Sequence, residues 1–142
     1  MTSINFYRPS STIDKLICFF SRGGYCHCNI TVNGDTYEAA PFGKVRQFQL
    51  EPSISRIESF TIELTTEQEL ALISFLFCQL GKGYDYFSIF GFILYQNDRP
   101  KYGRWFCSEL VFAALRKVGV PLLKRIEPFK VSPVILSTSP LI

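Results

Sequence analysis

Three residues of the sequence have side chains that could together carry out nucleophilic catalysis: His27, Glu38 and Cys107. His27 is the only histidine in the chain. A thiol becomes a strong nucleophile when an imidazole takes its proton, and a carboxylate can hold that imidazole in the required orientation. These residues could therefore form a Cys/His/acid site, provided that the fold brings them together.

The segment around His27 is predicted to be one arm of a β-hairpin. Residues 25–32 suit a strand, and the turn sequence at 33–35, Asn-Gly-Asp, leads into a second strand over 36–40. Side chains alternate along a strand, so His27 faces one side and Cys26 and Cys28 face the other as small hydrophobic residues. Glu38 is expected opposite His27 or within one step of it, where its carboxylate can accept the imidazole N–H.

Cys107 stands at the start of the most regular helical pattern in the chain. Apolar residues fall at 107, 110, 111, 114, 115 and 118, and Gly119 ends the pattern. The start of a helix carries a partial positive charge and free N–H groups, which stabilise a thiolate and can hold the oxyanion of a tetrahedral intermediate. Cys18 and Cys78 lie within apolar helical runs and lack this activation, so Cys107 is the predicted nucleophile.

Each of these residues also has a structural interpretation, which the sequence leaves open. Cys107 lies on the apolar stripe of its own helix and could be a core residue, His27 could be a hydrogen-bonded structural histidine, and Glu38 could be a solvated strand residue. A metal site is not expected, because alternation on a strand prevents Cys26, His27 and Cys28 from reaching one ion. No cofactor is expected either.

The remaining pattern predicts an α+β fold in one domain over 1–142. Further strands are expected at 4–7, 45–50 and 57–64, and a first helix from Ser10 or Ser11 to Phe20. A capping box from Thr66 to Glu69 predicts a helix that runs to about Leu80. An apolar, helical segment at 87–95, a polar loop at 96–104 and a short helix after Ser132 complete the prediction.

Composition excludes several classes of protein. The 142 residues, 47% of them hydrophobic, are enough for one globular domain. The net charge of +3 is spread along the chain, which argues against a nucleic-acid partner. Five cysteines do not suggest a disulfide framework, and there is neither a signal-peptide pattern nor a membrane-spanning apolar stretch. We therefore expect a soluble protein made in the cytoplasm.

Several segments resemble the circularly permuted branch of the NlpC-type papain-like cysteine peptidases, which includes the YiiX-like and the lecithin retinol acyltransferase-like proteins. Residues 25–30 resemble the histidine strand of this family, and 36–40 the acidic strand that follows it. Residues 83–86 resemble its Gly-x-x-Tyr-Asp-Tyr turn, and 105–111 its nucleophile segment. The sequence departs from the family at Cys26, where serine is common, and at Glu38, where some members have a second histidine.

The resemblance implies a papain-like core in which a small antiparallel sheet packs against the cysteine-bearing helix. It implies Cys107 as nucleophile, His27 as base and acid, and Glu38 as the residue that orients the imidazole. Four aromatic residues are expected in the substrate cleft or in the core: Tyr25, Tyr84, Tyr86 and Trp105.

The resemblance also implies an amide hydrolase, and a peptidoglycan stem peptide is the expected substrate. Residues 6–9 before the first helix are similar to proteins of bacteriophages, so a virion or tail location is a further hypothesis. Two alternatives stay open: an interaction module such as a phage component that keeps the fold without using the site, and an acyltransferase or hydrolase acting on lipids or thioesters.

Overall fold

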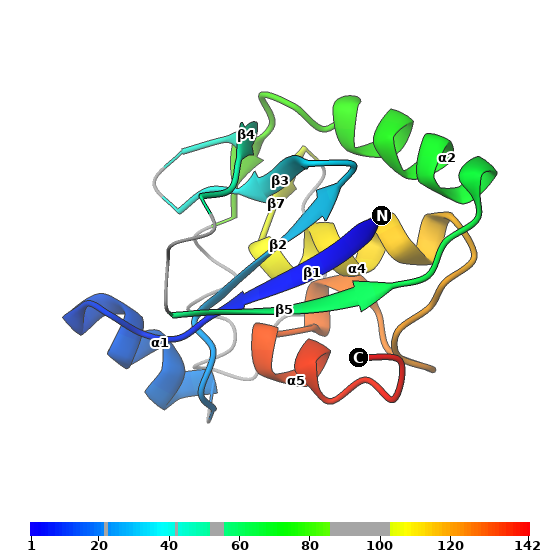
Figure 1. The fold of residues 1–142 in the computed structure, drawn as a ribbon. Helices are drawn as coiled ribbons and strands as arrows, with labels where there is room; N and C mark the ends of the chain where they lie inside the picture. The colour runs from blue at the N-terminus through cyan, green and yellow to red at the C-terminus, as the bar shows by residue number, and fades with distance from the viewer. Residues whose placement is uncertain (22, 42, 52–55, 86–102) are drawn as a thin grey trace.

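The main element of the fold is an antiparallel five-stranded sheet with the order β4-β3-β2-β1-β5. The computed structural model describes residues 1–21, 23–41, 43–51, 56–85 and 103–142. The strands are β1 (Thr2–Tyr7), β2 (His27–Val32), β3 (Asp35–Ala39), β4 (Val45–Gln49) and β5 (Ile57–Ile62). The N-terminal strand therefore lies in the interior of the sheet, between β2 and β5 (Figure 1).

The two faces of the sheet differ in chemistry because side chains alternate along each strand. One face is apolar and fully buried: Ile4, Phe6, Cys28, Ile30 and Val32 are at most 1% exposed. The opposite face carries mainly polar side chains, including the buried Asn5, Asn29 and Thr36. The apolar face forms the main core, and the polar face is available for a site.

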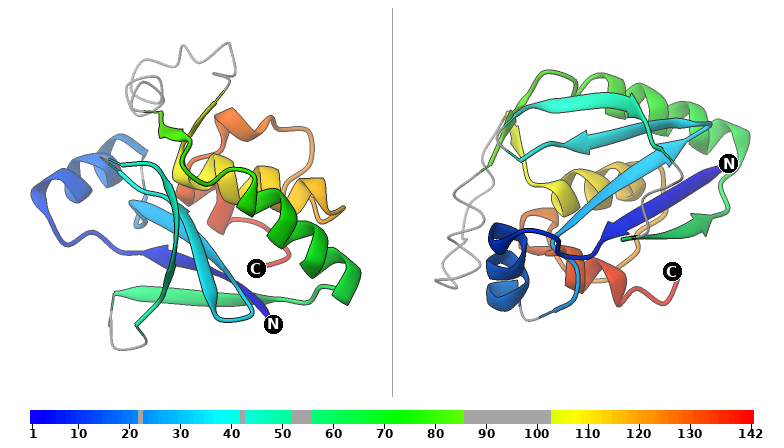
Figure 2. Two further views of the ribbon diagram at one scale, coloured as in Figure 1. Left: turned by 90° about the horizontal axis from the view of Figure 1, so that it is seen from above. Right: turned by 60° about the vertical axis from the view of Figure 1, so that its left-hand side comes forward.

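Helix α4 (Cys107–Lys117) lies across the apolar face of the sheet, against β2 and β3 (Figure 1). Its residues Leu110, Val111, Phe112 and Leu115 are completely buried. Helix α2 (Thr66–Phe77) and the C-terminal elements η1 (Pro128–Lys130) and α5 (Pro133–Ser137) pack against other sides of α4. Helix α1 (Thr12–Ser21) projects from one end of the sheet, as both views in Figure 2 show.

The mixed α and β architecture with an antiparallel sheet confirms the coarse fold prediction. The predicted helix at the start of α1 is also confirmed, since the Ser11 hydroxyl accepts a hydrogen bond from the Asp14 N–H. The predicted cap of the short C-terminal helix is confirmed by a bond from the Ile135 N–H to the Ser132 hydroxyl.

The predicted capping box of α2 is wrong by one residue. Thr65, not Thr66, is the N-cap: its hydroxyl accepts from the Gln68 N–H, while its own N–H donates to the Gln68 side chain. Two adjacent threonines, each followed three residues later by a Glu or Gln, make the two registers hard to separate in the sequence. The helix ends at Phe77, earlier than the predicted Leu80, because Leu80 closes a tighter turn onto Phe77.

Two further differences concern the surroundings of the site. Strand β2 begins at His27, two residues later than predicted. Residues Gly83–Tyr84 (β6) and Arg104–Trp105 (β7) form a small parallel sheet where the sequence predicted a turn and a loop. Such a short pair has too few residues for a periodic pattern. The predicted helical segment at 87–95 and most of the predicted loop at 96–104 lie outside the described residues.

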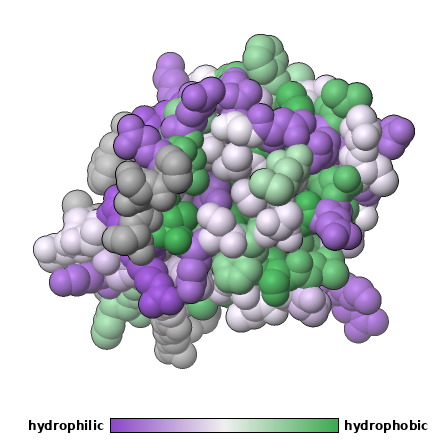
Figure 3. Space-filling model, in the orientation of Figure 1, coloured by the Kyte–Doolittle hydropathy of each residue, from purple (hydrophilic) through white to green (hydrophobic). Residues whose placement is uncertain are grey.

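The molecular surface mixes hydrophobic and hydrophilic residues. On the face drawn in Figure 3, hydrophobic residues show in several places among hydrophilic ones. Large exposed apolar side chains occur on α1, at Leu16 and Phe19, and on α2, at Leu70 and Phe77. None of the described helices has the length and hydropathy required to cross a membrane.

Candidate active site

Cys107 is the first residue of α4. The preceding residue, Phe106, is extended (φ −88°, ψ 155°), and its N–H is capped by the Glu109 carboxylate at 3.3 Å. Strand β7 leads directly into this turn and is fixed by its pairing with β6. The thiol therefore stands at the positive end of an eleven-residue helix, as predicted, and is 1% exposed.

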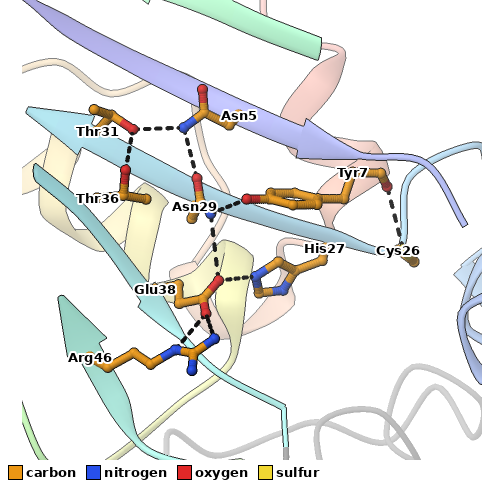
Figure 4. Close-up of polar contacts among 9 residues, drawn as sticks. All are labelled: Asn5, Tyr7, Cys26, His27, Asn29, Thr31, Thr36, Glu38 and Arg46. Atoms are coloured by element: carbon orange, nitrogen blue, oxygen red, sulfur yellow. Dashed lines mark hydrogen bonds and ion pairs between the residues drawn. The ribbon is translucent and has the colours of Figure 1, made fainter. Parts of the chain in front are cut away.

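His27 is the first residue of β2 and lies opposite Tyr7 of β1. The Tyr7 ring contacts the imidazole edge to face, with ring centroids 5.2 Å apart. The imidazole Nε2 lies 2.8 Å from Glu38 Oε2, and the two side chains are 13% and 6% exposed (Figure 4). The predicted contact between the base and the carboxylate is thus present in the structure.

The route by which Glu38 reaches His27 differs from the predicted one. Strands β2 and β3 pair Ile30 with Tyr37, so the next pair in the same register is Asn29 with Glu38. Glu38 lies diagonally from His27, two positions away and on the same face of the sheet. Asn29, directly opposite Glu38, donates to the same carboxylate oxygen at 3.5 Å.

The second oxygen of Glu38 is held by Arg46 of β4. The Arg46 Nε and Nη2 atoms donate to Oε1 at 2.8 and 2.6 Å, and Arg46 is the register partner of Glu38. Burial would raise the pKa of Glu38, but the contacts with His27 and Arg46 outweigh it and lower the pKa to about 2. The carboxylate stays charged between two cationic side chains.

The imidazole and the Cys107 thiol act on each other. Burial opposes protonation of His27, but the charges of Cys107 and Glu38 raise the pKa of the imidazole to about 10. Burial likewise opposes ionisation of Cys107, while Cys28 and the His27 charge lower the pKa of the thiol well below its usual value. Both shifts act in the direction that favours a thiolate paired with an imidazolium.

The two residues that lower the pKa of the Cys107 thiol, His27 and Cys28, are the first two residues of β2. Nδ1 of His27 is buried and makes no hydrogen bond within ordinary limits to any residue that the structure describes. Because Nε2 is bound to Glu38, Nδ1 is the nitrogen available for proton exchange with the thiol. Cys28, predicted as a small hydrophobic residue, also lowers the pKa of the predicted nucleophile.

A pocket of about 400 Å³ opens on the polar face next to His27 and Glu38. Its wall includes Tyr7 and Phe48, the apolar Pro41 and Leu50, and the guanidinium groups of Arg8, Arg46 and Arg56. Cys107 does not line this pocket. The pocket therefore gives access to His27 and Glu38, while Cys107 stands at the start of α4, which packs against β2 and β3.

Three of the four aromatic residues expected in the cleft or in the core lie away from the pocket beside His27. Tyr84 is buried and packs on Phe106, with ring centroids 5.8 Å apart. Trp105 packs near Phe75 and donates from Nε1 to Gln79 at 3.2 Å. Tyr25 packs on Phe6, and its hydroxyl contacts Glu58. None of these three lines the pocket beside His27, and Tyr86 lies outside the described residues.

Sequence reasoning missed three residues that surround the pair of His27 and Glu38: Tyr7, Asn29 and Arg46. A signal for Asn29 was present, because alternation places residue 29 on the same face as residue 27, and a buried amide in an apolar strand needs a partner. The positions of Tyr7 and Arg46 near His27 follow from the strand order, which places β1 and β4 on the two sides of the hairpin.

Comparisons with known proteins relate this chain to solved structures. No protein-family model matches the sequence, and no curated protein matches it. Among solved structures, the chain is similar to the crystal structure of the metalloprotein YiiX from Escherichia coli O157:H7, with a TM-score of 0.64 and 24% sequence identity. The match covers 98% of this chain and 83% of YiiX. The two proteins share a fold.

Proposed function

We propose that this chain is a cysteine hydrolase of the papain-like kind, with the order of its catalytic residues permuted so that His27 precedes the nucleophile Cys107. The observation that carries the proposal is a chain of contacts that ends at the base: Arg46 holds Glu38, and Glu38 holds His27 Nε2. Cys107 stands at the start of α4, and His27 and Cys107 each shift the pKa of the other. Each group has the ionisation state that nucleophilic attack requires.

In the proposed reaction the Cys107 thiolate attacks the carbonyl carbon of an amide, and the carbonyl oxygen takes the negative charge. N–H groups at the start of α4 have no partner within the helix and can stabilise that oxyanion. The imidazolium of His27 then donates its Nδ1 proton to the leaving nitrogen, and the amine leaves. The acyl group of the substrate remains bound to Cys107 as a thioester. Water, deprotonated by His27, cleaves the thioester and restores the thiol.

Glu38 has a supporting role in this scheme. Its carboxylate accepts a hydrogen bond from the Nε2–H group throughout, so that Nδ1 remains the nitrogen that exchanges protons with the thiol and the leaving group. Arg46 keeps the carboxylate charged and fixes its oxygens.

The proposed substrate is an amide, and the stem peptide of peptidoglycan is the candidate that the family resemblance favours. The test is incubation of the chain with isolated muropeptides, followed by mass spectrometry of the products. Wild-type protein should release a fragment, while Cys107→Ser should release none and should unfold at nearly the same temperature. Cleavage by the Cys107→Ser variant would refute the nucleophile assignment.

One observation favours a second candidate, an interaction module that retains the site without using it. Cys107 is 1% exposed and does not line the pocket at His27. A substrate carbonyl must reach the thiol. If the site is closed to substrates, His27, Glu38 and Cys107 have only a structural role. This candidate is supported if an activated acyl ester or thioester does not label Cys107. If only a phospholipid or a fatty thioester labels Cys107, the result favours lipid acyl transfer.

YiiX is described as a metalloprotein, which raises the question of a metal at this site. The residues that the structure describes contain no group of three or more His, Cys, Asp and Glu side chains that could hold an ion. The carboxylate nearest the histidine is already bound by the Arg46 cation, which would repel a metal ion. The donor set does not fit a metal, and no step of the proposed reaction involves one.

A further inference from the structure

A row of polar side chains crosses all five strands of the sheet and includes the carboxylate that holds His27. Its members are register partners on neighbouring strands: Ser59 pairs with Asn5, Asn5 with Asn29, and Glu38 with Arg46. Asn29 and Glu38 occupy the next paired position after Ile30 and Tyr37. Each strand contributes one residue, and all lie on the polar face.

The row is joined by hydrogen bonds. Ser59 Oγ donates to Asn5 Oδ1 at 2.7 Å, and Asn5 Nδ2 donates to Asn29 Oδ1 at 2.8 Å. Asn29 Nδ2 donates to Glu38 Oε2 at 3.5 Å, and Arg46 closes the row on Oε1.

The central members of the row are buried, which distinguishes them from ordinary polar strand residues. Asn5 is 1% exposed, Asn29 is not exposed at all and Glu38 is 5% exposed. Burying amides and a carboxylate is unfavourable unless every group is satisfied, and β-branched apolar residues would fill the same face without that cost. The fold alone does not require this row.

Asn29 has an orientation that the row fixes. Its Oδ1 accepts from Asn5, so its Nδ2 must face the other way, toward Tyr7 Oη at 2.7 Å and Glu38 (Figure 4). Tyr7 packs its ring against the imidazole, and Glu38 binds Nε2. A single buried amide therefore contacts both side chains that hold the His27 ring.

We propose that Asn29 is a positioning residue of the site: through Tyr7 and Glu38 it holds the His27 imidazole in the orientation that directs Nδ1 toward Cys107. This inference rests on the proposed function for its catalytic consequence, but its structural consequence can be measured without any substrate. The charged or titratable groups that act on His27 are Cys107 from α4 and Glu38 from β3, with Arg46 from β4 behind Glu38 and Tyr7 from β1 against the ring.

The test uses the full chain with ¹⁵N-labelled histidine, whose signals come from one residue because His27 is the only histidine. In Asn29→Leu, which keeps the volume and removes the amide, the pKa of His27 should fall by about one unit or more, a tenfold change in proton affinity. If an amide substrate is cleaved, kcat should fall by about ten- to a hundredfold with little change in KM, as expected for a small misplacement of a reacting group.

The matched control is Thr36→Val. Thr36 is buried on the same face and bonds Thr31 at 2.7 Å, but it joins the row only through Thr31 and Asn5, three bonds away from Asn29. Thr36→Val should lower stability without changing the pKa of His27. If Asn29→Leu does not fold, Asn29→Ser provides the same test, because its short side chain cannot span Tyr7 and Glu38.

An unchanged pKa of His27 in a folded Asn29 variant would overturn the proposal and make the row a structural device that fixes strand register. A lowered pKa in a chain that cleaves no substrate would support the positioning role and refute the hydrolase instead. Failure of the positioning role and failure of the proposed hydrolase function therefore give different results.

Discussion

Glu38 binds the imidazole of His27 at 2.8 Å from a diagonal position, two residues away from the direct cross-strand pair. The direct partner of Glu38 is Asn29, and Arg46 holds the carboxylate from the other side. This arrangement lets one carboxylate accept from three side chains while it remains buried. The site is thus built into the register of the sheet, and each of the following predictions tests one part of it.

Removing the charge of Glu38 should weaken the nucleophile. In Glu38→Gln the side chain keeps its size but no longer stabilises the imidazolium, so kcat/KM on a cleaved amide should fall by about a hundredfold or more. The control is Glu58→Gln, since Glu58 is also a strand carboxylate paired with an arginine, Arg8, but does not contact His27. Equal losses in both variants would argue against a specific role of Glu38.

The pKa of Glu38 also predicts how stability depends on pH. Its pKa is about 2 in the folded chain and close to 4.5 when unfolded, so its contribution is present in full above pH 4.5 and is lost as pH falls toward 2. The contribution amounts to about 3 kcal/mol. Urea unfolding between pH 2.5 and 5.5 should show a smaller loss of stability in Glu38→Gln than in wild type. Parallel curves would contradict the assigned pKa.

The pKa of Glu109 predicts the opposite dependence of stability on pH. Burial, with a further contribution from Asp85, raises the pKa of this carboxyl to about 7 despite its bond to the Phe106 N–H. A raised pKa means that stability falls as pH rises from about 4.5 through 7. Glu109→Gln can still accept from the same N–H, so it should be more stable than wild type by about 1–3 kcal/mol at pH 8 and equal to it at pH 4. If Glu109→Gln is less stable than wild type at pH 8, the charged form of Glu109 is what caps α4.

The ionisation of Cys107 should be visible in its alkylation. Between pH 6 and 8 the rate for an ordinary thiol rises by roughly tenfold per unit, because the thiolate fraction does. Cys78 is exposed and serves as the internal reference. The iodoacetamide rate at Cys107 should stay nearly constant over this range, and in His27→Ala it should rise with pH as for an ordinary thiol. A parallel rise at both cysteines in wild type would refute the thiolate assignment.

The sequence predicted the local parts of the site because each depends on a short pattern. The apolar spacing after residue 107 identified the helix and its start, and the turn at 33–35 identified the hairpin that carries His27 and Glu38. The register was off by one step: the sequence allowed Glu38 to be opposite His27 or one position away, and it is two away. In a hairpin the register is set by the geometry of the turn, which composition alone does not specify.

The parts that could not be predicted depend on contacts between distant segments. Arg46 reaches Glu38 only because β4 joins the free edge of the hairpin, and Tyr7 and Asn5 meet β2 only because the N-terminal strand inserts into the sheet. Strand order is a property of the whole chain, with no local signal. The pair β6 and β7 was missed for the same reason, since two residues on each side form no periodic pattern.

The proposed function depends most on the pairing of the Cys107 thiolate with the His27 imidazolium, and one titration measures this pairing directly. In protein labelled with ¹⁵N-histidine, the single imidazole should carry protons on both nitrogens at pH 8 and should titrate near pH 10. In Cys107→Ser, which removes the thiolate, its pKa should fall clearly below the wild-type value. An imidazole that titrates near 6.5 in wild type and is unaffected by the change at residue 107 would contradict the account.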